Sequence, residues 1–311
     1  MIKTEGLTKK YGNFTALDQL NLQIDRGVVY GFVGPNGAGK STTMSILATL
    51  LAPTSGRAMV SGYDVTTHPK QVRRHIGYMP DFFGVYDQFK VSEYLYFFGA
   101  SYGISRIEMN QMIPQLLELV NLSQKSDAYV DTLSRGMKQR LCLARCLVHD
   151  PDVLILDEPA SGLDPRARIE MRKILKELRS MGKTILISSH ILPELSELCD
   201  QIGVIEDGRL VASGKVSEIE KLKGSRLLQI RILQHLEATV RFFENQPLVS
   251  SVTVDDQDSC KILISYEGTD EQQASMLSLA IAQNLPIVSF SEVRTNLEDI
   301  FLEITKEDSS S

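Results

Sequence analysis

One stretch of eight residues constrains this chain more than any other: Gly34-Pro35-Asn36-Gly37-Ala38-Gly39-Lys40-Ser41. It fits the pattern G-x-x-x-x-G-K-[ST] of a phosphate-binding loop. The apolar run before it, 28–33, predicts a buried strand, and 41–51 after it predicts a helix. Glycines let backbone N–H groups wrap around a polyphosphate, and a helix N-terminus adds partial positive charge. An ordinary glycine-rich turn does not account for a strand, a glycine-rich loop, a Lys-Ser pair and a helix in this order. The stretch therefore predicts binding of a nucleoside triphosphate.

Two carboxylates are the next candidates for chemistry. Asp157 and Glu158 directly follow the apolar run 153–156, and four apolar residues in a row suit a parallel strand buried on both faces. Ligands of open α/β sheets bind at the carboxyl ends of such strands. The alternative is a solvated turn after a strand.

Composition limits the classes of partner. A chain of 311 residues predicts one large and one smaller domain. The net charge of -6 argues against an electrostatic grip on nucleic acid. The N-terminus lacks the apolar region that would predict a secretory signal. No apolar run reaches the roughly eighteen residues that a membrane span needs. We therefore expect a soluble chain, or one held at a membrane by a partner protein.

Cys142, Cys146 and His149 recur at i, i+4 and i+7 and would share one helix face. Three metal ligands could line up in this way, but no fourth ligand is close in sequence. We favour a buried helix stripe in which free cysteine acts as a small hydrophobic residue.

The order of predicted elements divides the chain. Residues 1–224 read as an α/β domain that opens with antiparallel strands, with Tyr11 in the turn 10–13 between them. Helical periodicity predicts an inserted helical subdomain at about 82–148, and the aromatic residues of 91–102 are expected to be mostly core, with a minority facing a partner. Residues 225–305 read as βαββαβ followed by a helix, a small α+β domain of ferredoxin-like type. The tail 306–311 is expected to be disordered.

Further motifs follow the phosphate-binding loop in a fixed order: Leu133-Ser134-Arg135-Gly136-Met137, Leu156-Asp157-Glu158-Pro159, Ser161-Gly162-Leu163-Asp164, and His190 after a strand. Together they resemble the nucleotide-binding subunits of ATP-binding cassette (ABC) transporters, over about 2–222. The resemblance implies a P-loop ABC ATPase core with an antiparallel β subdomain and a helical insert. The C-terminal domain, ending Asn296-Leu297-Glu298-Asp299-Ile300-Phe301-Leu302, is similar to that of bacterial drug-, sodium- or lipid-export ATPases.

This resemblance implies an ATP-binding and ATP-hydrolysing subunit that drives export through a separate integral membrane permease. It also implies ATP and Mg²⁺ as cofactors, a second ATP-binding subunit (a copy or a paralogue), and a peripheral location on the cytoplasmic face of the membrane. One alternative is a soluble ABC ATPase acting on nucleic acid or ribosomes, but such proteins usually carry two cassettes, coiled coils or basic arms. Another is a phosphate-loop GTPase or kinase, against which the stretch 133–137 argues. The transported substrate stays open.

The resemblance also implies roles for single residues. Tyr11 would stack on adenine, Asp157 would hold Mg²⁺ and Glu158 would be the general base, while His190 would contact the γ-phosphate and the attacking water. The alternative for His190 is a structural histidine or helix cap. The remaining implied contacts are Lys40 with the β- and γ-phosphates; Ser41 with Mg²⁺; Gly34, Pro35, Asn36, Gly37, Ala38, Gly39 and Thr42 with the phosphates; Ser134 and Gly136 with the ATP of the opposite subunit; and Asp164 in the turn that couples the two sites.

The sequence departs from the commonest family pattern in two places. Arg135 stands where glycine is common and Met137 where glutamine is common; because Ser134 and Gly136 are intact, we expect a working site. The family usually places a glutamine that touches Mg²⁺ after a strand such as 76–79, and here that position is Asp81. We expect Asp81 to contact the metal and nucleotide; the alternative is that it only caps the turn after Pro80.

Overall fold

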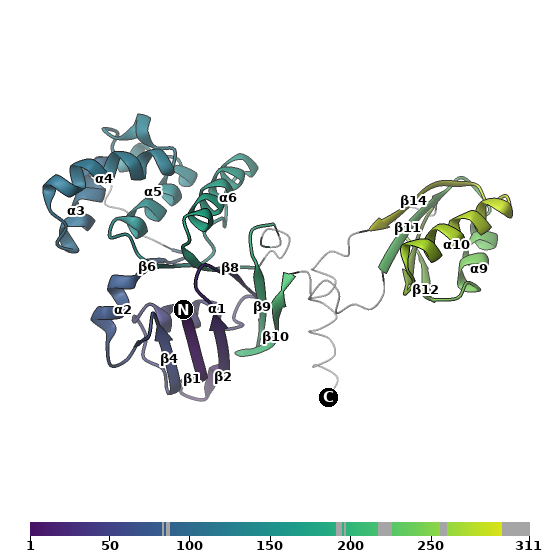
Figure 1. Ribbon diagram of the computed structural model, residues 1–311, viewed down its shortest axis with the longest axis horizontal. Helices are drawn as coiled ribbons and strands as arrows, with labels where there is room; N and C mark the ends of the chain where they lie inside the picture. The colour runs from purple at the N-terminus through teal and green to yellow at the C-terminus, as the bar shows by residue number, and fades with distance from the viewer. Residues whose placement is uncertain are drawn as a thin grey trace. The chain divides into compact units, whose positions relative to one another are not determined.

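The computed structural model describes residues 1–82, 84, 88–190, 195, 197–216, 226–255 and 260–293. The chain divides into two compact units, Met1–Val216 and Ser217–Ser311 (Figure 1). The predicted domain boundary between 224 and 225, the predicted helix after 293 and the tail 306–311 lie outside the described residues, as does most of a helix expected at 191–199.

An antiparallel sheet of order β2-β1-β4-β5 begins the first unit. Its strands are β1 (Ile2–Tyr11), β2 (Phe14–Ile24), β4 (Ser55–Val60) and β5 (Tyr63–Asp64). The expectation that Tyr11 would lie in the turn is wrong, because β1 continues through several register shifts until Tyr11 pairs with Phe14. Tyr11 therefore closes a strand instead of lying in the loop.

The second sheet of this unit has the order β10-β9-β3-β8-β7-β6. All its neighbours pair in parallel except β9 and β10. These two are joined by Asp207 and Gly208 with φ of 44° and 79°, the positive values that an Asp-Gly hairpin turn requires. Every residue of β3 and β7 is buried, as the unbroken apolar runs predict. The strands are β3 (Val29–Val33), β6 (Ile76–Met79), β7 (Val153–Leu156), β8 (Thr184–Ser189), β9 (Gln201–Glu206) and β10 (Arg209–Lys215).

Helices cover both faces of this sheet (Figure 1). On one face α1 (Lys40–Leu47) joins the two sheets through a core that includes Tyr30, Phe32 and Met44. The helix predicted over 41–51 is shorter, because Thr49 turns the backbone into the left-handed region with φ of 62°. The other face carries α5 (Arg135–Leu147) and α6 (Pro165–Ser180).

The helical insert consists of α3 (Val91–Ser101), α4 (Arg106–Leu119) and α5, while α2 (Pro69–His75) precedes β6. Ser105 caps α4 with a reciprocal bond from Glu108. Arg140 on α5 fastens the insert: its Nη1 donates to Val120 O at 2.8 Å, and its Nη2 lies 3.3 Å from Glu170 on α6. Arg140 therefore connects the helical insert to α6, the helix that follows Asp157 and Glu158.

The second unit forms a separate antiparallel sheet of order β12-β13-β11-β14. This order, with the chain sequence βαββαβ, is the ferredoxin-like topology that the sequence predicts. Its core includes Leu228, Ile230, Phe243, Ile264 and Tyr266, and among the described residues none of this core comes from the first unit. The elements are β11 (Arg226–Ile232), α9 (Leu236–Glu244), β12 (Val249–Val254), β13 (Lys261–Tyr266), α10 (Asp270–Ala282) and β14 (Ile287–Val293).

Candidate active site

The phosphate-binding loop runs from the end of β3 into α1 and needs glycine at defined places. Gly39 has φ of 108°, and a Cβ there would lie 2.7 Å from Ala16 O. A Cβ on Gly34 would lie 2.3 Å from Ile205 O. Glycine at these positions lets the loop pack against β2 and β9 while its backbone turns toward the start of α1.

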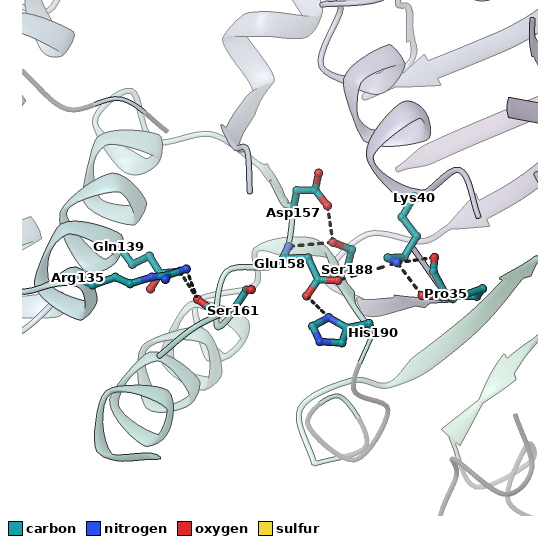
Figure 2. A network of polar contacts seen from close by, with 10 residues as sticks. Pro35, Lys40, Arg135, Gln139, Asp157, Glu158, Ser161, Ser188 and His190 are labelled. Atoms are coloured by element: carbon teal, nitrogen blue, oxygen red, sulfur yellow. Dashed lines mark hydrogen bonds and ion pairs between the residues drawn. The ribbon is translucent and has the colours of Figure 1, made fainter. Parts of the chain in front are cut away.

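Lys40 begins α1 and is buried, with 6% of its surface exposed. Its Nζ donates to Gly34 O at 2.6 Å and to Pro35 O at 3.1 Å (Figure 2). Burial lowers the pKa of Lys40, and the negative charges of Glu158, Asp157 and Asp81 oppose that shift. Three carboxylates from two strand ends thus act on one buried cation.

The two carboxylates after β7 are oriented by one hydroxyl. Ser188 Oγ donates to Asp157 Oδ1 at 2.6 Å, and it accepts the backbone N–H of Glu158 at 2.9 Å. Glu158 has φ of 49°, a left-handed conformation that a residue with a side chain adopts at a cost. Ser188 carries no sequence signal for this role beyond its place near the end of a predicted apolar strand, β8.

Glu158 lies between a cation and an imidazole. Its Oε1 is 4.0 Å from Lys40 Nζ, and its Oε2 is 2.9 Å from His190 Nδ1 (Figure 2). Glu158 is largely buried, whereas about half of His190 faces solvent. A carboxylate held in this way can accept a proton from a water molecule that approaches from the exposed side.

The residues of the stretch 133–137 contact a different part of the chain. Ser134, a residue type that favours helix starts, is the N-cap of α5 and accepts the Met137 N–H at 3.4 Å. Arg135 and Gln139 both reach Ser161 O at 3.2 Å. In Figure 2 these two side chains lie on the far side of Ser161 from Lys40. The structure therefore joins α5 to the turn after Glu158 and does not bring Ser134 to this chain's own phosphate-binding loop.

The other predicted residues lie at the starts of helices, except Tyr11, which ends β1. Asp164 is the N-cap of α6 and accepts the Ala167 N–H at 2.9 Å. Gly136 faces α6 so closely that a Cβ would lie 2.9 Å from Ala167 Cβ. Tyr11 is half exposed, with Lys9 Nζ 5.1 Å from its ring centre. Ser41 and Thr42 lie in the first turn of α1.

The oxygen donors available here suit Mg²⁺. Asp157 is buried at the end of β7, and Ser41 offers a hydroxyl beside the phosphate-binding loop. Within the described part of the chain there is no group of three or more His, Cys, Asp or Glu side chains that could hold a metal. Mg²⁺ in phosphate sites takes one or two carboxylates and completes its shell with phosphate oxygens and water, so this donor set fits the ion.

Cys142, Cys146 and His149 make contacts of another kind. Cys146 Sγ lies 3.1 Å from Tyr78 O, and His149 Nε2 lies 2.8 Å from Ile76 O. The His149 ring stacks on Tyr102 at 3.8 Å. Together with buried Cys142, these side chains pack α5 against β6 and the end of α3.

Fold and site together define a class: a phosphate-loop ATPase with an antiparallel β subdomain, a helical insert and paired carboxylates after a central strand. The ABC transporter family model matches residues 17–161, and the model described as ATP-binding protein DrrA1-3-like, C-terminal domain, matches residues 214–305. The chain belongs to the ATP-binding cassette family of transporter ATPases and is an ATP-binding subunit of that family.

Relatives and solved structures agree with this membership. The chain is 36% identical to the Nod factor export ATP-binding protein I of Ralstonia nicotianae, over 98% of this chain and 94% of that protein. It is 37% identical to the daunorubicin/doxorubicin resistance ATP-binding protein of Streptomyces peucetius, over 98% and 92%. A dimeric ATP-binding cassette in a post-hydrolysis state with ADP and Pi matches with a TM-score of 0.63 at 26% identity, over 70% of this chain and 99% of that one.

A search of the described helices finds none that is both long and apolar enough to cross a membrane.

Proposed function

We propose that this chain is the ATP-hydrolysing subunit of an exporter and acts on a separate integral membrane permease at the cytoplasmic face of the membrane. The observation that carries the proposal is Glu158, held between Lys40 and His190 at the ends of parallel strands. The two relatives described above are a Nod factor export protein and a drug resistance protein. Their names favour transport over the alternative of an ABC ATPase acting on nucleic acid or ribosomes.

The side chains of this site divide the work of phosphoryl transfer, which depends on positioning and charge stabilisation. The loop N–H groups and Lys40 bind the phosphates. Glu158 takes the proton of the attacking water, and His190 orients the Glu158 carboxylate through Oε2. Ser41 and Asp157 hold Mg²⁺, which supplies positive charge to the phosphate oxygens when bound, and Tyr11 stacks on the adenine.

The proposal includes a second cassette. Ser134 and Gly136 flank Arg135 at the start of α5, and Arg135 lies on the far side of Ser161 from Lys40 of the same chain (Figure 2). They therefore need the nucleotide of another subunit, either a second copy or a paralogue. Asp164 lies in the turn between the two sites. The similarity to a cassette solved as a dimer with ADP and Pi supports this arrangement.

The proposed permease contact includes three exposed aromatic residues, Phe82, Phe97 and Tyr102, which we call the aromatic surface. Their side chains are 92%, 46% and 44% exposed. Tyr94 and Leu95 of the same helix, α3, are buried in the core. An exposed apolar patch on a helical insert commonly marks an interface. We include the preceding segment 82–89 in the proposed contact, and part of it lies outside the described residues.

The test is Glu158→Gln. We expect kcat to fall by about 10²–10⁴-fold, because the amide cannot act as a general base, while ATP binding persists. Light scattering with MgATP should then show an accumulated dimer. The matched control is Glu158→Gln combined with Lys40→Met, which should stay monomeric because it loses the phosphate contact. A Glu158→Gln protein that remains monomeric at high concentration, with the permease present, contradicts the two-cassette mechanism.

A further inference from the structure

Arg135 occupies a position that is unfavourable for helix stability. It is the first residue of α5, where the helix dipole is positive, and the first turn of α5 contains no acidic residue. A cation here weakens the helix, because like charges repel. Favourable contacts of the Arg135 side chain must therefore offset its unfavourable interaction with the helix dipole.

Arg135 and Gln139 lie one turn apart on the same face of α5 and converge on one carbonyl oxygen (Figure 2). Arg135 Nη2 donates to Ser161 O at 3.2 Å, and Gln139 Nε2 donates to the same atom at 3.2 Å. Gln139 is only 3% exposed, which restricts its orientation. We call these three residues the Ser161 clamp.

The Ser161 clamp continues to the general base. The N–H of Ser161 donates to Glu158 O at 3.0 Å, and the N–H of Glu158 donates to Ser188 Oγ at 2.9 Å. Glu158 has the left-handed φ of 49°, a conformation that persists only where its surroundings hold it. The peptide groups on both sides of Glu158 are thus held by hydrogen bonds, and one of them leads to α5.

Gly162 and Arg135 fit each other. Gly162 has φ of 64°, and a Cβ on it would lie 2.4 Å from Arg135 Cζ. The guanidinium group therefore fills space that only glycine leaves open. Arg135, where the family commonly has glycine, is accommodated by this turn of the same chain.

We propose that Arg135 is a positioning residue that couples the N-terminus of α5 to Glu158 through the Ser161 clamp. This inference rests on the proposed function, in which Ser134 and Gly136 bind the ATP of the opposite subunit while Glu158 acts on the ATP of its own. The clamp then links the two nucleotide sites inside one protomer. When α5 engages the opposite nucleotide, the turn 158–161 follows it.

The first test compares Arg135→Ala with Arg166→Ala in the full chain. Arg166 is a control from the same region, 92% exposed and paired with Glu170. We expect Arg135→Ala to lower kcat about tenfold, because misplaced catalytic groups are costly, with the KM and Kd for ATP within twofold of wild type. Arg135→Lys, which keeps one donor, should recover part of kcat. A kcat within twofold of wild type, or a loss confined to Tm, overturns the proposal.

The second test is a double-mutant cycle that combines Gly162→Ala with Arg135→Ala. The backbone cost of alanine at positive φ is common to both backgrounds and cancels. The collision with the guanidinium exists only when Arg135 is present, so Gly162→Ala should lower Tm and kcat more in wild type than in the Arg135→Ala background. Equal effects overturn the proposal. Because Tm is read without catalysis, absent ATPase activity in wild type would contradict the proposed function separately.

Discussion

Asp81 brings an unusual charge to the nucleotide site. It follows β6 through Pro80, and its carboxylate, together with Asp157, acts electrostatically on Lys40 and Tyr78. An ionised carboxylate donates no hydrogen bond, unlike the glutamine that the family usually places here. A negative charge in this place favours a divalent cation and repels a γ-phosphate. We expect the attraction to Mg²⁺ to win, because the ion is the largest local charge.

Asp81→Ala should therefore raise the Mg²⁺ concentration needed for half-maximal ATPase activity, by about tenfold if one charge-assisted contact is lost. Asp81→Gln should restore much of the turnover, since its carbonyl oxygen can still face the metal. The measurement is a Mg²⁺ titration of ATPase rate for wild type and both variants. Superimposable titration curves would show that Asp81 only caps the turn after Pro80.

At the scale of elements, local sequence signals located the strands β6 and β7 and the capped start of α5. Unbroken apolar runs identify strands that are buried on both faces, and a serine before a helix is a strong local signal. The Ser188 bridge could not be predicted, because it depends on which two strands pair. The length of β1 and the contact of Arg135 with Ser161 depend likewise on tertiary register and packing.

Helix α3 carries the prediction for the permease contact. Phe97→Glu places a charge on the exposed aromatic surface, whereas buried Tyr94 on the same helix keeps the core intact. We expect loss of membrane association in cells that contain the permease, with ATP binding unchanged. Met181→Glu is the control, because Met181 is 59% exposed at the end of α6. Equal loss of ATP binding in Phe97→Glu would mean that the residue supports the fold.

The described residues include two hydrophobic cores that are separate from each other. One joins the sheets of the first unit around α1, and the other lies within the second unit, with no residue in common. The described residues that contact or surround Lys40 and Glu158 all belong to the first unit.

A fragment of residues 1–216 should therefore fold alone and bind ATP within about threefold of the full chain, because a unit with its own core is an independent domain. Circular dichroism and a nucleotide titration check this expectation. The fragment 226–293, titrated in parallel, should fold without binding ATP. An aggregated first fragment, or a loss of affinity beyond tenfold, would show that the second unit is needed for the nucleotide site.

Because the backbone of Glu158 is left-handed, the residue that is best for stability at this position differs from the residue that is needed for catalysis. Glycine at this position would relieve on the order of 1 kcal/mol of conformational strain, yet it would remove the carboxylate that faces Lys40 and His190. A screen that rewards only heat resistance would accordingly enrich variants that have lost the base. Efforts to evolve a more robust form of this protein should hold position 158 fixed, or select for turnover in every round.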